Sequence, residues 1–286
     1  MPGGPFPGPP AEVLLVTDNI DTATFERFVD LIYQRAGIKL GPHKRALVSS
    51  RLGKRMRALG VADYQQYFDI VQQDATEAEL VALLDAISTN VTHFYREERH
   101  FDVLADLLRK WEQQGQKRFR LWCAAASTGE EPYTIAITLA ENLRQVNDTK
   151  ILATDISTKV LDTARCGLYD QQKVSKIPPQ MRSKYFSAVR QNSVTAYEVA
   201  PRLKNMITFA RLNLAEPPFP MRGPLDVVFC RNVMIYFDNP VRKRLLDEMY
   251  RLLKPGGYLM VGHAESLSGL LSEFKSVAPS IYIKSG

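Results

Sequence analysis

Apolar residues recur at helical spacing through the first third of the chain. From Phe25 to Tyr33 they fall on one helical face, with Asp21 or Thr22 placed to cap the start and Gly37 to end the helix. Further helices are expected over 44–59, 64–71 and 78–87. The pattern predicts a small all-α domain.

Beyond residue 100 the chain alternates between short apolar runs and helical patterns. The runs have the β-branched and aromatic bias of buried strands. We expect strands over 119–123, 150–155, 225–230, 258–262 and 280–284, and helices over 101–111, 159–164 and 241–253. This alternation predicts a mainly parallel sheet covered by helices on both faces.

One interval departs from that alternation. Between Tyr185 and Asn213 there is no glycine, and residues 193–199 and 205–209 look like short strands around polar turns. We expect a small antiparallel β-subdomain here, over about 187–211, inserted in the α/β domain.

The length of 286 residues indicates two domains, one of them small. The opening MPGGPFPGPP is rich in proline and glycine and predicts a disordered tail. The expected parts are a tail over 1–17, a helical domain over 18–88, a linker over 89–100 and an α/β domain over 101–286.

Composition excludes several classes of protein. Hydrophobic content of 45% and charged content of 24% are those of an ordinary globular protein. The opening lacks the basic and apolar regions of a signal peptide, and no apolar run is long enough to span a membrane. We expect a cytoplasmic protein. Three scattered cysteines and four dispersed histidines, without a C-x-x-C pair, predict neither a disulfide framework nor a metal site.

The segment LWCAAASTGEEPY, Leu121 to Tyr133, carries the candidate chemistry. An apolar strand breaks into small residues, which let backbone approach a ligand, and a helix follows. Such turns often bind pyrophosphate at the helix start, but here Glu130 and Glu131 stand there. An acid at this place suits a ligand that carries an amino group and no phosphate, such as S-adenosylmethionine.

Asp155, at the end of the next strand, supports a nucleoside ligand. It follows Gly129 by 26 residues, close to the spacing at which an acid binds ribose hydroxyls in doubly wound sheets. The alternative is a helix cap, although Ser157 could cap that helix unaided. Ribose binding is favoured because the turn and the acid agree.

Charge is unevenly distributed in the helical domain. Eight basic residues and no acid lie between Arg35 and Arg57, and six acids and no base lie between Ala58 and Ser88. A helical face is expected to present a basic stripe formed by Lys44, Arg51, Lys54 and Arg55. The stripe is either a docking surface or an ordinary solvated face.

Seven motifs in order resemble the CheR-type chemotaxis receptor methyltransferases. They are AGIKLGPHKRALVSSRL, TNVTHFYRE, LWCAAASTGEEPY, ATDIS, ARLNL, FCRNVMIYFD and LKPGGYLMVGHAES. The resemblance covers the chain beyond the tail. It implies an α/β fold with a Rossmann-like methyltransferase sheet, a small N-terminal all-α receptor-docking domain and an inserted antiparallel β-subdomain.

The resemblance also implies site residues. A cofactor site for S-adenosylmethionine falls on Asn90, Thr92, Arg96, Glu130, Asp155, Asn213, Leu214, Arg231 and Asn232. Arg96 would bind the methionine carboxylate, Glu130 the ammonium and Asp155 the ribose. Arg96 and Tyr236 are the expected catalytic residues, which orient the incoming carboxylate. Tyr236 could instead be a core aromatic, and His263 a satisfied core imidazole.

The implied reaction methylates glutamate side chains on the cytoplasmic helices of methyl-accepting chemotaxis receptors and leaves S-adenosylhomocysteine. The enzyme is expected to act at membrane receptor arrays without inserting in the membrane. Two alternatives are a nucleic-acid methyltransferase and a non-catalytic sensor of the cofactor or receptor. No aromatic-rich basic sheet supports the first, so no nucleic-acid partner is expected, and the intact site residues oppose the second.

Some family members bind a receptor C-terminal pentapeptide as an extra strand on the β-subdomain, through a hairpin that carries Gly-x-Gly. This chain has no glycine there, and its best turn candidate is Gln191-Asn192-Ser193. We therefore expect a pentapeptide-independent enzyme.

Overall fold

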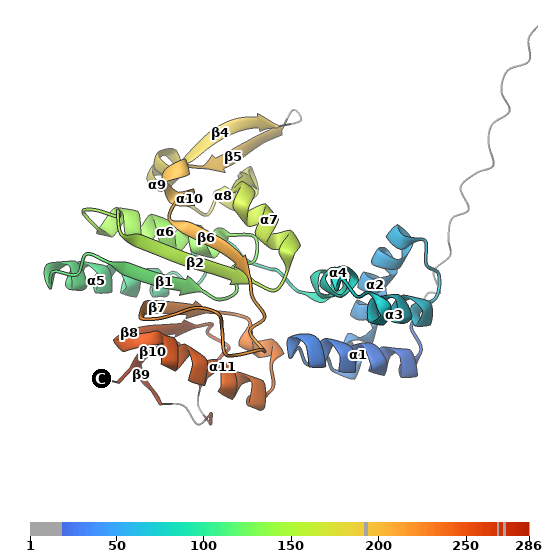
Figure 1. Ribbon diagram of the computed structural model, residues 1–286. Coiled ribbons are helices and arrows are strands. Elements are labelled where there is room, and N and C mark those ends of the chain that lie inside the picture. The colour runs from blue at the N-terminus through green and yellow to red at the C-terminus, as the bar shows by residue number, and fades with distance from the viewer. Residues whose placement is uncertain (1–18, 192–193, 268, 271–272, 286) are drawn as a thin grey trace, which may run out of the picture. The chain divides into compact units, whose positions relative to one another are not determined.

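A computed structural model describes residues 19–191, 194–267, 269–270 and 273–285 (Figure 1). The predicted tail, 1–17, lies outside the described residues. The chain divides into two compact units: residues up to Leu31 together with Leu40–Ile87, and Ile32–Lys39 together with Ser88–Gly286. The second unit carries the sheet and the proposed cofactor residues.

The first unit is helical, as the periodicity predicts. Its elements are α1 (Thr22–Ala36, the end of which groups with the second unit), η1 (Pro42–Lys44), α2 (Arg45–Leu59), α3 (Tyr64–Gln73) and α4 (Ala78–Ile87). Asp21 accepts a hydrogen bond from the Thr24 N–H at 2.9 Å and so caps α1. In the core, Phe28 packs edge-on against Phe68 at 5.0 Å between ring centroids. Leu59, the last residue of α2, is 39% exposed.

The second unit contains a seven-stranded sheet in the order β6-β2-β1-β7-β8-β10-β9. The strands are β1 (Phe119–Cys123), β2 (Thr149–Asp155), β6 (Ile207–Arg211), β7 (Leu225–Cys230), β8 (Leu253–Val261), β9 (Phe274–Ala278) and β10 (Ile281–Lys284). The pairs from β6 to β8 are parallel, and β10 pairs antiparallel with both β8 and β9. The α/β fold class predicted from the sequence is confirmed.

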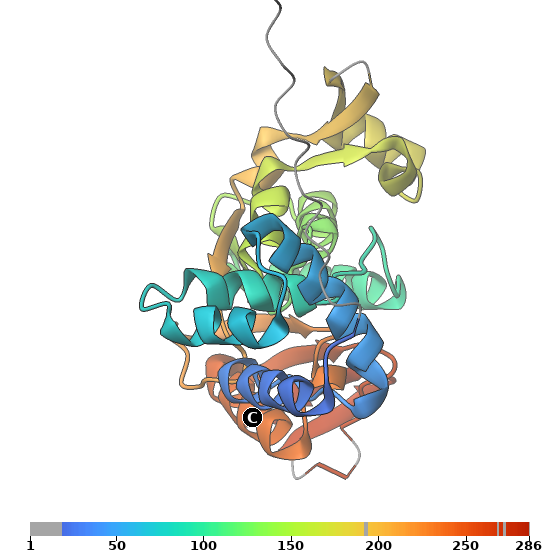
Figure 2. The same ribbon diagram turned by 90° about the vertical axis from the view of Figure 1, so that its right-hand side faces the viewer.

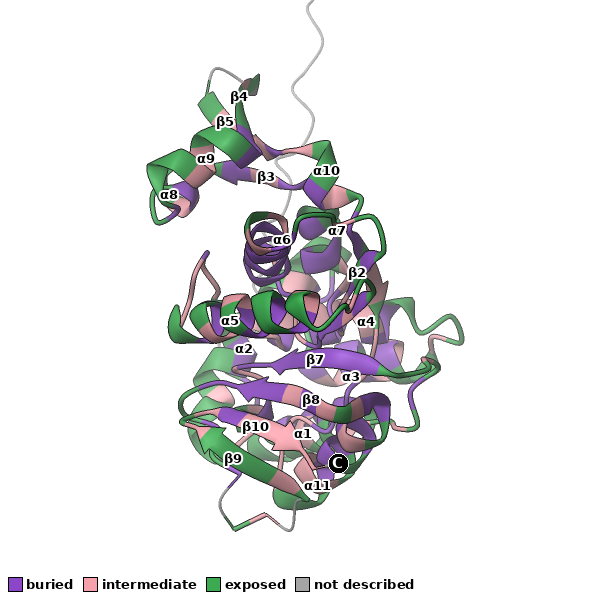
Figure 3. Cartoon of the chain, turned by 90° about the vertical axis from the view of Figure 1, so that its left-hand side faces the viewer, coloured by how far each residue is buried: buried purple, intermediate pink, exposed green. Residues whose placement is uncertain are grey.

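Helices cover both faces of this sheet, which explains why its central strands are apolar on both sides. They include α5 (Arg99–Gln113), α6 (Glu130–Asn142), α7 (Thr158–Cys166) and α11 (Asn239–Leu252). One core lies between the sheet and α5 and α6, and another lies between the opposite face and α11. Figure 3 shows β7 buried along its length, whereas β9 at the sheet edge is largely exposed.

A separate three-stranded antiparallel sheet is inserted after α7, in the order β3-β5-β4 (Figure 2). Its segment contains β3 (Leu168–Asp170), α8 (Gln171–Val174), α9 (Pro179–Tyr185), β4 (Phe186–Gln191), β5 (Val194–Val199) and α10 (Pro201–Lys204). The expected extent of about 187–211 is wrong at its end, because β6 pairs in parallel with β2 in the main sheet. The sequence also missed β3, whose three residues are too few to show a period.

None of the helices in the described residues is long and apolar enough to cross a membrane.

Candidate functional site

The sheet order brings the candidate residues to one edge. Because β1 lies between β2 and β7, the turn after β1 is flanked by Asp155 at the end of β2 and by Arg231 and Asn232 after β7. Ligands of open α/β sheets bind beyond the carboxyl ends of the strands. The fold therefore supports the edge at which the sequence placed the cofactor.

The turn after β1 is tightly built. Gly129 has φ +97°, and a Cβ there would lie 2.6 Å from the Tyr169 hydroxyl oxygen and 2.9 Å from the Ala164 Cβ. The Ala126 N–H donates to the Thr154 carbonyl at 2.8 Å, which ties the turn to the end of β2. Glycine is required here by conformation and by space.

The Asp155 carboxylate organises the turn after β1. One carboxylate oxygen accepts the Ser127 N–H at 2.9 Å and the other accepts the Ser157 N–H at 3.0 Å. The cap of α7 is Ser157, whose hydroxyl accepts the Val160 N–H. The alternative reading of Asp155 as the helix cap is therefore wrong.

Glu130 has a partner that sequence reasoning missed. Its buried carboxylate lies 2.6 Å from the Lys173 ammonium, and its other oxygen accepts the Thr128 hydroxyl at 2.6 Å. Lys173 belongs to α8 in the inserted segment. No local pattern reports a pair formed across 43 residues.

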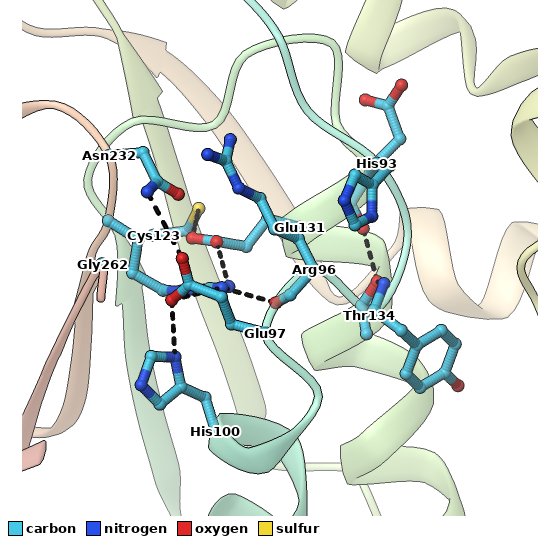
Figure 4. Close-up of polar contacts among 12 residues, drawn as sticks. His93, Arg96, Glu97, His100, Cys123, Glu131, Thr134, Asn232 and Gly262 are labelled. Carbon is cyan, nitrogen blue, oxygen red and sulfur yellow. Dashed lines mark hydrogen bonds and ion pairs between the residues drawn. The ribbon is translucent and has the colours of Figure 1, made fainter. Parts of the chain in front are cut away.

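Arg231 lies at the centre of a buried charge network (Figure 4). Its guanidinium is 2.6 Å from Glu131 and 3.2 Å from Glu97, and it also donates to the Arg96 carbonyl. Burial raises the pKa of Glu131. Burial also tends to raise the pKa of Glu97, but Arg231, Asn232 and His263 together outweigh it, and the net shift of this pKa is downward. The Arg231 side chain thus stabilises the linker through Glu97 and the Arg96 carbonyl.

The linker is fixed to the turn and to α6. The Asn90 carbonyl accepts the Ser127 hydroxyl at 3.1 Å, and the Tyr95 N–H donates to the Thr134 hydroxyl at 3.3 Å. The Arg96 guanidinium donates to the Val91 carbonyl at 2.8 Å. Thr92 is partly buried between these anchors.

After β6, the Asn213 side chain forms hydrogen bonds that fix the loop in which it lies. Its amide nitrogen donates to the Arg35 carbonyl and to Glu216, both at 2.7 Å, and its amide oxygen accepts the Ala215 N–H. Leu214 is buried in the core on the α11 side of the sheet. Both the amide nitrogen and the amide oxygen of Asn213 therefore have hydrogen-bond partners within the protein.

A second missed residue, Glu265, organises the loop after β7. Its buried carboxylate accepts N–H groups of Asn232 at 2.6 Å, Gly262 at 2.7 Å and Ile235 at 3.3 Å. Asn232 has φ +59°, and this carboxylate holds its backbone in place. Tyr236 lies in η2 (Met234–Tyr236) and is partly buried. The motif VGHAES contained Glu265, but nothing in its spacing marked the acid as buried.

The basic stripe divides into two kinds of residue. Lys44 and Lys54 are exposed. Arg55 makes a two-pronged contact with buried Glu79, at 2.9 Å and 2.6 Å, and Arg51 donates to the Ile87 carbonyl. The sequence did not distinguish these two arginines, which contact other helices' residues, from the two exposed lysines.

Two histidines that were expected to be dispersed lie together. His100 and His263 place ring nitrogens near Glu97, with all the potential ligand atoms within 4.8 Å of one another. Arg231 already balances the charge of Glu97, and a divalent cation would be repelled by it. We therefore assign no metal to this cluster.

Comparisons with known proteins show the family to which the chain belongs. Residues 23–88 match the family described as CheR methyltransferase, all-alpha domain, and residues 90–283 match CheR methyltransferase, SAM binding domain. The chain is 42% identical to the chemotaxis protein methyltransferase of Salmonella typhimurium, over 92% of this chain and 90% of that protein. It is 36% identical to the protein of that name from Borreliella burgdorferi, over 93% and 95%.

Among solved structures, an amino pentose methyltransferase from Micromonospora echinaspora, with S-adenosylmethionine bound, matches 57% of this chain and 49% of its own. The identity is 14% and the TM-score 0.34. Since both domain models and relatives of similar length match nearly the whole described chain, the chain belongs to the CheR methyltransferase family.

Proposed function

We propose that the edge of the sheet beyond β1, β2 and β7 binds S-adenosylmethionine and that this enzyme methylates receptor glutamates there. The supporting observation is the turn closed on Asp155, in a chain of the CheR family. Backbone approach at Gly129, an acid for an ammonium at Glu130 and an acid for ribose hydroxyls at Asp155 fit this cofactor. The Arg231 side chain is bound to Glu131 and to the Arg96 carbonyl. At this edge we therefore expect Arg231 and Asn232 to contact the cofactor through backbone groups.

The cofactor, when bound, supplies an electrophilic methyl carbon on its sulfonium. A glutamate nucleophile has an ordinary pKa of about 4.3 and is already ionised at neutral pH, so no general base is needed. The protein's task is alignment, which can contribute roughly 7–11 kcal/mol toward a barrier. Arg96 attracts carboxylates by charge, and Tyr236 offers a phenolic hydrogen bond to the incoming one.

The cofactor site is tested by Asp155→Ala. This variant should bind S-adenosylhomocysteine about 1.5–3 kcal/mol more weakly, the scale of hydrogen bonds to a charged group. Titration calorimetry measures the change. Ser157→Ala is the control, because it removes the cap of α7 and leaves the Asp155 carboxylate in place. Unchanged affinity in Asp155→Ala would refute the ribose assignment.

The substrate-orienting role is tested at Tyr236. Tyr236→Phe should lower the turnover number by about tenfold or more, with little change in cofactor affinity. A tenfold decrease corresponds to a rise of about 1.4 kcal/mol in the activation free energy. A methyl-transfer assay on a receptor cytoplasmic fragment gives the rate. Arg96→Ala, in contrast, should abolish transfer. Full turnover in Tyr236→Phe would make the phenol a structural group only.

We further propose that the helical unit docks the receptor through Lys44 and Lys54, while Arg51 and Arg55 hold the unit together. The exposure of the two lysines and the internal contacts of the two arginines support this division. Docking by exposed charge should be sensitive to salt.

We also propose that the enzyme does not require a receptor pentapeptide. The β4–β5 hairpin pairs from Phe186↔Val199 to Gln191↔Val194 and contains no glycine. The turn residues Asn192 and Ser193 lie outside the described residues. Without glycine, the hairpin lacks the backbone freedom that the family's peptide tether uses.

A further inference from the structure

The Lys173 side chain forms an ion pair with Glu130, a residue of the proposed cofactor site. Its ammonium lies 2.6 Å from the Glu130 carboxylate and 3.3 Å from the Thr128 hydroxyl. The Glu130 side chain is fully buried, whereas the Lys173 side chain is 38% exposed. An acid at the start of α6 is thus covered by a lysine that reaches water.

The ion pair has a direct electrostatic reason. A buried carboxylate without a counter-charge is costly, so Glu130 needs a cation whenever the site holds no ligand. The cofactor's ammonium would supply the same charge from the ligand side. Two ammonium groups against one carboxylate repel each other, so the lysine and the ligand compete for Glu130.

We propose that the Lys173 ammonium takes the place of the amino group of the cofactor. It neutralises the Glu130 carboxylate before the cofactor binds, and the cofactor's amino group then displaces it. This inference rests on the proposed function, since it takes Glu130 as the group that meets the ammonium. Its consequence is that the inserted segment, which carries Lys173, sets the affinity for ligands with an amino-acid group.

The surrounding contacts allow the lysine to move alone. The Tyr169 hydroxyl donates to the Thr128 carbonyl at 2.8 Å and fills the space that a side chain at residue 129 would need. The Asp170 carboxylate caps α8 by accepting the Lys173 N–H at 2.8 Å. The backbone of the segment is therefore anchored, and only the flexible lysine side chain has to swing into water.

Titration calorimetry on the full-length chain tests the proposal with two ligands. S-adenosylhomocysteine carries the ammonium without the sulfonium charge, and methylthioadenosine shares the nucleoside but has no amino-acid group. Lys173→Met should bind S-adenosylhomocysteine about tenfold more tightly, which corresponds to about 1.4 kcal/mol, because no lysine has to be displaced. Its affinity for methylthioadenosine should equal that of the unchanged chain.

Lys184→Met is the matched control, because Lys184, in α9 of the inserted segment, makes an ion pair of the same 2.6 Å with Glu141 of α6. It should change neither affinity. Lys173→Gln, which keeps a polar group beside Thr128, provides a second variant if Lys173→Met folds poorly, and it should also bind S-adenosylhomocysteine more tightly.

Four outcomes would overturn the proposal or the function on which it rests. Weaker binding of S-adenosylhomocysteine to the Lys173 variants would mean that the lysine contacts the ligand. An equal change for both ligands would mean a general effect on the turn. Failure of the unchanged chain to bind S-adenosylhomocysteine, with methylthioadenosine still bound, would refute the role of Glu130, and failure to bind either would refute the proposed function itself.

Discussion

His100 shows at the scale of a single residue how the buried network constrains the enzyme. Its ring is fully buried, and neither nitrogen has a hydrogen-bond partner among the described residues. The Nδ1 atom lies 3.6 Å from a Glu97 oxygen, and the ring packs edge-on against His263 at 5.6 Å between centroids. Burial first, and then the nearby Arg231 charge, lowers the pKa of His100 to about 4.

This shift predicts a loss of stability in acid. In the unfolded chain His100 takes up a proton below its usual pKa of 6.5, but in the folded chain only near 4. The free energy of unfolding should therefore fall as the pH drops from 6.5 toward 4, by up to about 1.4 kcal/mol per pH unit from this residue. Denaturant titrations at a series of pH values measure the slope.

His100→Leu should show a shallower slope over that range, because leucine cannot titrate. His43→Leu, at an exposed position, is the control and should keep the slope of the unchanged protein. Equal slopes in all three proteins would place the acid-sensitive group elsewhere.

At the scale of an element, α2 combines two functions on neighbouring faces. Val48, Leu52 and Met56 are buried in the helical core. Beside them, Arg55 fixes α2 to α4 through Glu79, whose carboxylate also accepts the Tyr67 hydroxyl at 2.8 Å. Lys54, one position earlier, points to solvent. Adjacent basic residues on one helix therefore have different roles.

Charge reversal separates these roles. Arg55→Glu should lower the free energy of unfolding by about 1–3 kcal/mol, because it removes a charge-assisted bond and places two acids together. Lys54→Glu should leave stability within about 0.5 kcal/mol and raise the apparent KM for receptor at low salt. Denaturant unfolding and methylation kinetics give the two readings. Equal KM values for Lys54→Glu and the unchanged chain would make the stripe an ordinary solvated face.

At the scale of the whole molecule, the inserted sheet ends in β4, an edge strand that is open among the described strands. An open edge can accept an added strand, so the proposed independence from a pentapeptide rests on the absence of glycine from the hairpin. Calorimetry with a receptor C-terminal pentapeptide should show no binding in the micromolar range. Receptor fragments with and without that pentapeptide should be methylated at equal rates. Micromolar binding to this sheet would refute the glycine argument.

Much of the fold could be predicted from the sequence because the signals that specify helices and strands are local. Strand β7 is buried over its full length and apolar except for Asp226, and Gly37 and Ser157 stand where helices end or begin. Strand β6 was assigned to the wrong sheet because its alternation is weak and its partner, β2, lies far away in sequence. The sequence of a short strand does not specify the strand with which it pairs.

Some features of the candidate site could likewise be predicted from the sequence, and others became visible only in the structure. The sequence by itself determined the turn at Gly129, the acid at Asp155 and the family to which the chain belongs, since each depends on residues close together in the chain. Only the tertiary structure decided that Lys173 neutralises Glu130, that Glu265 binds the loop after β7 and that Arg231 supports the linker. Ion pairs and backbone contacts of this kind join residues from separate elements, and only the order of the strands brings them within bonding distance.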